Sequence, residues 1–184
     1  RATDMNARLV AQRLTAAWGQ SVIVDNRPGA GGVIGTEQVA RAAPDGYTLL
    51  AANPGPLTIA PSLRADLHYD PQKSFAPVLP TARNTVLFAV NSGLGIDTAQ
   101  DMIAHAKEKP GTFTVAVTGI GAISHLAIEM LQSAAKIKLQ AVPYRGAGPA
   151  ISDLIGGQVN AMSAEVLVLL PQIKAGKVKI LAVA

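Results

Sequence analysis

Short apolar segments typical of strands alternate with helix-like segments along most of the chain, and turns rich in glycine and proline separate them. Where strands alternate with helices of about ten residues, the chain forms right-handed βαβ units, and such units build a parallel sheet. The pattern therefore predicts an α/β fold. It is most regular in the second half, where helices are predicted over 98–107, 124–135, 149–155 and 166–175, and strands over 112–118, 139–143, 159–162 and 178–183.

The first half follows the same alternation less regularly. A helix is predicted over 3–18, with Thr3 or Asp4 as its N-cap, and Asp97 or Thr98 is the predicted N-cap of the first helix in the second half. The alternation occurs on both sides of residues 75–90, which predicts two lobes, 1–84 and 85–184, with crossover strands between them. The other elements predicted here are a helix over 33–43 and strands over 21–25, 47–52, 75–80 and 85–90.

The composition excludes several classes of protein. Of the 184 residues, 49% are hydrophobic and 15% are charged, so the chain can bury a core and is not intrinsically disordered. The absence of cysteine excludes disulfides, thiolate catalysis and cysteine-type zinc sites. No apolar run is long enough to span a membrane, and the longest candidate is 166–170. Without an initiator methionine or a leader, we expect a processed, trimmed or partial chain.

The charge distribution argues against nucleic acid as a partner. The net charge is +4, but each half of the chain carries 8 Lys or Arg and 6 Asp or Glu residues. Neither half forms the dense basic surface, or the aromatic stacking platform, that nucleic-acid binding requires. The mild positive charge favours small anions instead.

Three predicted loops each follow a strand and open a helix: 118–125, 143–149 and 163–165. Because the carboxyl ends of parallel strands meet at one edge of a sheet, we expect these loops to lie together. Glycines let backbone N–H groups approach a ligand, and helix N-termini add unpaired donors and a partial positive charge. The loops predict a site for a small anion, most simply a carboxylate. The alternative is that they are ordinary turns with capping serines.

Glu165 follows the predicted strand 159–162 at the same edge as the glycine loops. If its carboxylate faces the site, it can pair with an ammonium or hydroxyl group of a ligand. The alternative is a solvated glutamate that the helix dipole favours at a helix start.

No catalytic, nucleotide-binding or metal-binding motif is present. The glycine-rich run 29–35 lacks the glycine at position 34 that a dinucleotide fingerprint needs, and neither G-x-x-x-x-G-K-[ST] nor G-x-S-x-G occurs. Ser124 and His125 point about 100° apart on a helix, so they do not form a nucleophile–base pair. His68, His105 and His125 lack metal-ligand spacing, and we interpret His125 as a helix-start or core-edge histidine. The sequence therefore predicts no catalytic residue, metal or cofactor.

Several segments resemble one family of proteins. Residues 25–32 (DNRPGAGG) and 43–50 (APDGYTLL) resemble the signature of Bug-type, or TctC-like, solute receptors, the extracytoplasmic binding proteins of tripartite tricarboxylate transporters. The second half agrees at 124–127 (SHLA), 142–150 (VPYRGAGPA), 153–159 (DLIGGQV) and 173–177 (IKAGK). The resemblance runs in order over essentially the whole chain.

The resemblance implies an α/β fold like that of type II periplasmic binding proteins. Such a fold has two lobes, each with a mostly parallel sheet flanked by helices, which close on a small carboxylate. It also implies that the chain is truncated at both ends. Lobe one (1–84) would then lack its first strand and its C-terminal part, and lobe two (85–184) would include the crossover strands.

The resemblance also implies positions for the site. Residues 1–4 resemble the tail of the loop after the family's first strand, and residues 53–55 resemble a second contact in lobe one. Residues 118–124 resemble the donor loop of lobe two, with 144–146 beside it. The ligand-binding residues that the resemblance implies are Thr3, Asn53, Gly55, Thr118, Gly121, Ser124, Tyr144, Arg145 and Gly146. To these we add Glu165, which lies where the chain departs from the family's pattern.

Residues 163–165 depart from the family's pattern. Many members carry an aromatic residue, an acid and an amide here, whereas this chain carries Ser163, Ala164 and Glu165. We expect Glu165 to favour a ligand with an amine or hydroxyl group, such as an amino dicarboxylate.

The expected function is that of a periplasmic receptor without its signal peptide. It would capture a dicarboxylate, tricarboxylate or amino dicarboxylate and deliver it to the permease subunits of a transporter, without itself being embedded in the membrane. One alternative is an α/β enzyme that acts on a small carboxylate or phosphate ester. The other is a structural or signalling module that never contacts a transporter.

Overall fold

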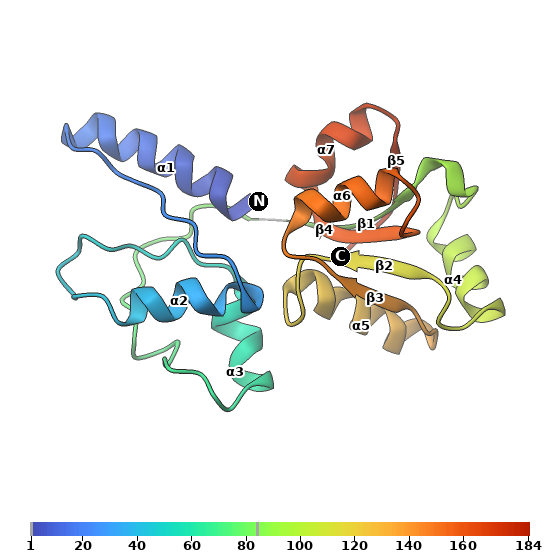
Figure 1. The fold of residues 1–184 in the computed structure, drawn as a ribbon, viewed down its shortest axis with the longest axis horizontal. Helices are drawn as coiled ribbons and strands as arrows, with labels where there is room; N and C mark the ends of the chain where they lie inside the picture. The colour runs from blue at the N-terminus through green and yellow to red at the C-terminus, as the bar shows by residue number, and fades with distance from the viewer. Residues whose placement is uncertain (1, 84) are drawn as a thin grey trace. The chain divides into compact units, whose positions relative to one another are not determined.

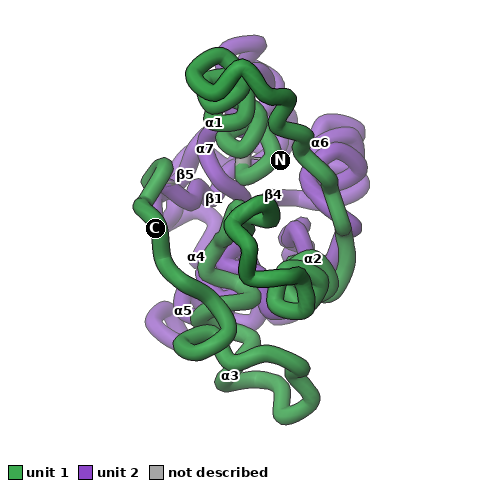
Figure 2. The backbone as a smooth tube through the Cα atoms, turned by 90° about the vertical axis from the view of Figure 1, so that its left-hand side faces the viewer, with its two compact units in different colours: residues 1–83 green, residues 84–184 purple. Residues whose placement is uncertain are grey.

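The structure is a computed structural model that describes residues 2–83 and 85–184. The chain divides between residues 83 and 84 into two compact units, shown in different colours in Figure 2. Unit 1 (1–83) combines helices with irregular segments, and unit 2 (84–184) is a sheet covered by helices (Figure 1). No helix among the described residues has both the length and the hydropathy needed to cross a membrane.

Unit 2 is built on a five-stranded sheet with the order β3-β2-β4-β1-β5. Strand β2 is parallel to β3 and β4, whereas β1 is antiparallel to β4 and β5. Strands β2, β3, β4 and β5 thus run in the same direction, so the mostly parallel sheet expected for this lobe is confirmed. The sequence does not give the opposite direction of β1, because a continuous apolar run identifies a buried strand but not its direction. The strands are β1 (Val86–Asn91), β2 (Thr114–Val117), β3 (Gln140–Pro143), β4 (Ala161–Glu165) and β5 (Val178–Val183).

Helices cover both faces of this sheet and give unit 2 two apolar cores. One core packs beneath α6 (Ala147–Ile155) and α7 (Val166–Lys174), and the other beneath α4 (Ala99–Glu108) and α5 (Ile123–Ala135). Successive strand residues alternate between the two faces, so Leu87 and Ala89 belong to the first core and Phe88 and Val90 to the second. Such a three-layer arrangement places the strand ends, and the loops that follow them, at the sheet edges. The turn η3 (Ser92–Leu94) joins β1 to the chain leading into α4.

Helix α4 begins with the cap expected from the sequence. The hydroxyl of Thr98 accepts the N–H of Asp101 at 3.1 Å, and the Asp101 carboxylate accepts the N–H of Thr98 at 2.9 Å. Interactions of the Asp101 carboxylate with the side chain and with the backbone N–H of Thr98 lower the pKa of Asp101. The pair forms a capping box, which satisfies two backbone donors that the helix leaves open.

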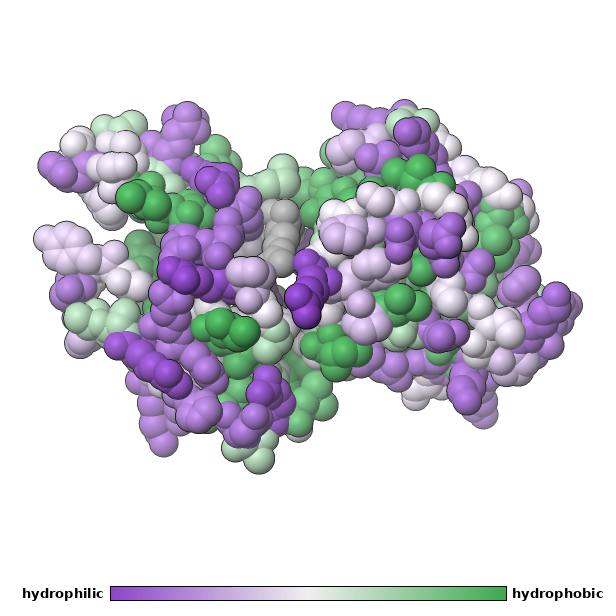
Figure 3. Space-filling view, viewed as in Figure 1, coloured by the Kyte–Doolittle hydropathy of each residue, from purple (hydrophilic) through white to green (hydrophobic). Residues whose placement is uncertain are grey.

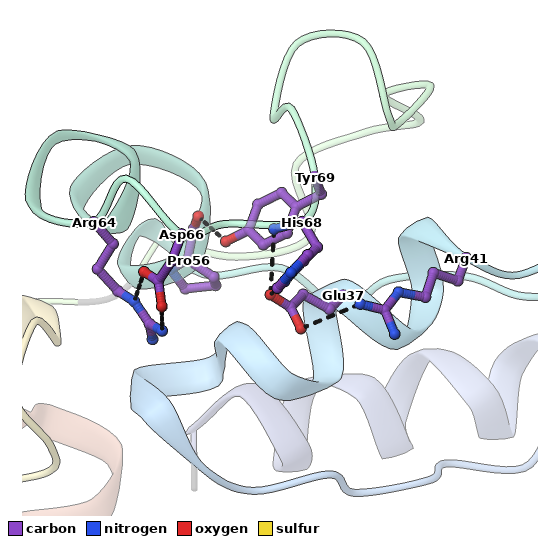
Figure 4. A network of polar contacts seen from close by, with 7 residues as sticks. All are labelled: Glu37, Arg41, Pro56, Arg64, Asp66, His68 and Tyr69. Atoms are coloured by element: carbon purple, nitrogen blue, oxygen red, sulfur yellow. Dashed lines mark hydrogen bonds and ion pairs between the residues drawn. The ribbon is translucent and has the colours of Figure 1, made fainter.

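Unit 1 contains helices and a small core. The core consists of Val33, Ala60 and Tyr69, with partly buried apolar neighbours around it. The buried hydroxyl of Tyr69 donates to the carbonyl of Pro56, and the Glu37 carboxylate contacts Nδ1 of His68 at 3.2 Å (Figure 4). The hydrogen bond from His68 lowers the pKa of Glu37. The elements are α1 (Ala2–Trp18), η1 (Ala30–Gly32), α2 (Val33–Ala40), η2 (Gly55–Ile59) and α3 (Ala60–Leu63).

The strands predicted in the first half are wrong at 21–25, 47–52 and 75–80. No strand is present in the described residues of unit 1, because a strand exists only where its backbone pairs with a neighbour. Apolar side chains of these segments are therefore exposed to solvent: Ile23 is 84% exposed and Tyr47 is 93% exposed. Figure 3 shows hydrophobic side chains on the surface of this unit, between hydrophilic ones.

Two predicted helix boundaries also differ. Helix α1 already includes Ala2, so Thr3 and Asp4 lie inside the helix and neither is its N-cap. Asp4 instead accepts the side-chain amide of Asn26 at 2.7 Å, which lowers the pKa of Asp4 and ties the following segment to α1. Helix α2 ends at Ala40, ahead of the turn at 44–46, instead of at residue 43.

Candidate functional site

Two glycine-rich loops of unit 2 begin at the same edge of its sheet. One joins β2 to α5 and the other joins β3 to α6. The N–H of Tyr144 donates to the carbonyl of Val117 at 2.9 Å, which ties the start of the second loop to the end of β2. Because β2 and β3 are parallel, the N-termini of α5 and α6 both lie at this edge.

The backbone of these loops needs glycine at defined positions. Gly121 has a φ of +75° and Gly146 a φ of +111°, a region that residues with a side chain rarely adopt. The N-cap positions of α5 and α6 are Ala122 and Gly146, and neither offers a side-chain cap. Among the described residues, no partner is found for the N–H groups of Ile123 and Ser124, or of Ala147 and Gly148. Both helices therefore present open backbone donors, which attract anions.

Thr118 and Ser124 are joined inside unit 2. Oγ of Ser124 accepts the N–H of Thr118 at 3.2 Å and lies 3.0 Å from its Oγ1. Ser124 is 1% exposed, so its hydroxyl faces the interior. Its backbone N–H belongs to the first turn of α5 and has no hydrogen-bond partner among the described residues. The predicted ligand role of these two residues would then come from the backbone and from the shape of the loop that their side chains fix.

Gly121 is held by a residue of the same loop to which the sequence assigned no role in the site. The N–H of Gly121 donates to Nδ1 of His125 at 3.3 Å, and Nε2 of His125 lies 3.5 Å from Oε1 of Glu129. His125 is the third residue of α5, in agreement with its interpretation as a helix-start histidine. No sequence motif predicts that a histidine side chain accepts a hydrogen bond from the backbone N–H of a glycine four residues earlier. Only the structure identifies this contact.

The residues that follow β3 have different surroundings. The hydroxyl of Tyr144 donates to Oδ2 of Asp153 at 2.6 Å, and partial burial together with this hydrogen bond raises the pKa of Tyr144 to about 12. Arg145 is exposed, and Gly146 is buried at the start of α6. The phenol is thus oriented by α6, while the backbone of Gly146 allows the helix start to approach the sheet edge.

The third loop predicted from the sequence is part of a strand. Residues 163–165 belong to β4, because they pair with β1 from Phe88 to Val86. Glu165 is the last residue of β4 and the N-cap residue of α7, and it is half-buried. Ser163 is fully buried, and its hydroxyl has no hydrogen-bond partner among the described residues. Because β4 is parallel to β2, the end of β4, and with it Glu165, lies at the same edge of the sheet as the two loops.

Unit 1 brings two of its three predicted site residues together. Oδ1 of Asn53 accepts the N–H of Gly55 at 3.0 Å, and Gly55 is buried at the start of η2. A side chain at Gly32 would lie 3.4 Å from Pro56, so the glycine-rich turn 29–32 packs closely on this segment. Thr3 lies within α1, not in a loop as predicted, and no hydrogen bond joins it to Asn53 or Gly55 among the described residues.

The described residues contain no cluster of three or more His, Asp or Glu side chains that could hold a metal ion. The arrangement in unit 2 is instead one of backbone donors, glycine turns and hydroxyl groups at one sheet edge. Backbone donors at helix N-termini favour the binding of small anions.

Comparison with known proteins gives the family. The model of the tripartite tricarboxylate transporter family receptor matches residues 6–184. The chain belongs to this receptor family. The resemblance read from the sequence is thereby confirmed, and the family is one of transporter receptors and not of enzymes.

Individual members support this assignment. Protein BugT of Bordetella pertussis is 36% identical over 182 residues, which is 98% of this chain and 56% of BugT. This chain therefore spans about half the length of the curated relatives it matches. A solved structure of a periplasmic transporter is 38% identical, with a TM-score of 0.95 over 100% of this chain and 61% of the other.

Two further solved structures of similar proteins contain ligands. Rpa4515 of R. palustris, solved with adipate, is 34% identical with a TM-score of 0.93 over 98% of this chain and 60% of the other. MatC of Rhodopseudomonas palustris, solved with bound malate, is 31% identical with a TM-score of 0.91 over 99% of this chain and 62% of the other. The similarity to these solved structures confirms the prediction that this chain has the α/β fold of a periplasmic binding protein.

Proposed function

We propose that the protein binds a small dicarboxylate in the periplasm and delivers it to the permease subunits of a tripartite tricarboxylate transporter. The observation that carries the proposal is the pair of open helix N-termini, α5 and α6, at one sheet edge of a chain in this receptor family. The structures of Rpa4515 with adipate and MatC with malate support a dicarboxylate as the ligand class.

The energetics of such a site are sufficient for a receptor. A micromolar complex corresponds to about 8 kcal/mol of binding free energy. Hydrogen bonds between backbone donors and a carboxylate contribute about 1.5–3 kcal/mol each, and the entropy of association offsets part of this sum. The backbone donors of Ile123 and Ser124 on α5, and of Ala147 and Gly148 on α6, are numerous enough to hold one carboxylate group in this range.

Glu165 is proposed to select among dicarboxylates. Its carboxylate lies at the end of β4, at the same edge as the two helix starts, and would repel a ligand carboxylate placed next to it. A ligand with a hydroxyl or ammonium group at that position would pair with it. The proposal thus favours malate or aspartate over adipate. A Glu165→Gln variant should reduce this preference, and a variant that ranks the three ligands as the parent chain does would remove Glu165 from the site.

Thermal unfolding with added ligands tests the proposal. The panel contains malate, aspartate, succinate, adipate and citrate, with adipamide as a control of similar size without charge. A ligand at about 1,000 times its Kd stabilises the folded state by about 4 kcal/mol, which raises the Tm by several degrees. A rise with one or more carboxylates and none with adipamide is expected. Absence of any rise, both in this chain and in a chain extended to the length of its relatives, would refute carboxylate binding.

A pair of serine variants then locates the site. Ser124→Ala removes the hydroxyl that fixes Thr118 and is expected to weaken binding several-fold without unfolding unit 2. Ser133→Ala, near the other end of α5, changes an exposed serine and should leave affinity unchanged. Isothermal titration with the best ligand of the panel measures both. Equal affinities of the two variants would place the ligand away from the start of α5.

A further inference from the structure

Helix α5 begins without a side-chain cap. Its N-cap residue is Ala122, which has no oxygen to accept the N–H groups of the first turn. A serine, threonine or aspartate at this position would occupy the same donors that a ligand carboxylate needs. The open cap leaves these donors available, but it also removes the usual means of fixing the loop that enters the helix.

Two side chains of the first turn hold this loop from opposite ends. Ser124 holds its start through the two contacts with Thr118. His125 holds its end, where Nδ1 accepts the N–H of Gly121 at 3.3 Å. In a capping box, too, the third residue of the helix reaches back to a backbone N–H, that of the N-cap residue. Here the third residue reaches one position further, to the residue that precedes the N-cap.

The contact defines the form of the imidazole ring. A ring nitrogen accepts a hydrogen bond only when it carries no proton, so the proton of neutral His125 lies on Nε2. Nε2 lies 3.5 Å from Oε1 of Glu129, one turn along α5, and this carboxylate favours a proton on that nitrogen. The side chain of His125 is 21% exposed, so the surrounding structure also restricts its rotation.

We propose that His125 is a positioning residue of the ligand site. Its Nδ1 holds Gly121 in its left-handed conformation, with a φ of +75°, and so fixes the loop that leads into the first turn of α5. The part of this inference that concerns affinity rests on the proposed function. The contact between His125 and Gly121 does not depend on any ligand.

Asparagine and glutamine distinguish this role from simple packing. Oδ1 of asparagine is separated from Cα by as many bonds as Nδ1 of histidine, whereas Oε1 of glutamine is one bond further and matches Nε2. His125→Asn therefore keeps an acceptor for the N–H of Gly121, and His125→Gln moves the acceptor toward Glu129. Both variants remove the imidazole ring, so they serve as controls for each other.

Nuclear magnetic resonance of the ligand-free chain tests the contact. The ¹⁵N shifts of His125 should show a proton on Nε2 and none on Nδ1. The amide of Gly121 should exchange at a similar rate in the parent chain and in His125→Asn, and about tenfold faster in His125→Gln. A proton on Nδ1 of the neutral ring, or equal protection of Gly121 in the two variants, would overturn the inference.

Titration with malate and with adipate tests the consequence for binding. His125→Asn is expected to keep the Kd of the parent chain within about twofold, and His125→Gln to raise it about tenfold. An equal rise in both variants would show that the ring acts by packing and would overturn the positioning role. If the parent chain binds neither acid, the proposed function fails for these ligands, and Gly121 exchange still decides the role of His125.

Discussion

Two buried serines of unit 2 differ in one respect. Ser124 is hydrogen-bonded to Thr118, whereas Ser163 has no partner among the described residues. Removing an unpaired buried hydroxyl relieves its desolvation, so Ser163→Ala should raise the free energy of unfolding by about 1 kcal/mol. Ser124→Ala should lower it by about 1–3 kcal/mol, because the N–H of Thr118 loses its acceptor. Urea unfolding measures both, and destabilisation by Ser163→Ala would show that this hydroxyl is paired in solution.

Tyr144 makes stability depend on alkaline pH. Its pKa is about 12 in the folded chain against 10.0 for a free tyrosine, so the folded state holds the proton more tightly. Stability therefore falls as the pH rises from about 10 to about 12. Tyr144→Phe should cost about 1 kcal/mol near neutral pH through the lost hydrogen bond to Asp153, and this cost should shrink above about pH 10.

The control for Tyr144 is Tyr47, which is 93% exposed. Because the Tyr47 side chain is exposed, Tyr47→Phe should leave the urea midpoint unchanged. Tyr69, whose pKa burial also raises, contributes equally to the parent chain and to both variants and so cancels in the comparison. A cost of Tyr144→Phe that is the same at about pH 8 and about pH 11.5 would contradict the raised pKa of Tyr144 in the folded chain.

At the scale of elements, the sequence predicts unit 2 better than unit 1 for a physical reason. Helix signals are local: the Thr98 cap lies within three residues of Asp101, and the predicted start of α4 is confirmed. Strand signals depend on partners that are distant in the chain. The strand 178–183 is confirmed because β1 pairs with it, whereas 21–25 has the same apolar pattern without a partner among the described residues.

The same distinction explains which parts of the site were predictable. The glycine loops after β2 and β3 follow from sequence, since glycine and helix starts are local features. The position of Glu165 at the end of a strand does not, because β4 extends to it only through pairing with Val86. The contact of His125 with Gly121 depends on ring orientation, which no sequence pattern encodes.

At the scale of the whole molecule, apolar burial is unequal between the units. Unit 2 has two cores on either side of its sheet, with Val90, Val115 and Leu154 completely buried. Unit 1 has one small core, and many of its large apolar residues are more than half exposed: Met5, Leu9, Trp18, Ile23, Tyr47, Leu49, Leu63, Val78 and Leu79. Since apolar burial is the main stabilising contribution, unit 2 should be the more stable unit of this chain.

Hydrogen exchange followed by mass spectrometry tests this inequality. Peptides that contain β1, β2 and β4 should exchange about a hundredfold more slowly than peptides from α1 or from residues 47–52, because their amides open only when unit 2 unfolds. Peptides from α4 serve as an internal control, since this capped helix lies over a core of unit 2 and should follow the strands. Exchange in α1 as slow as in β2 would show that the units unfold together, and the stability of unit 1 would then depend on unit 2.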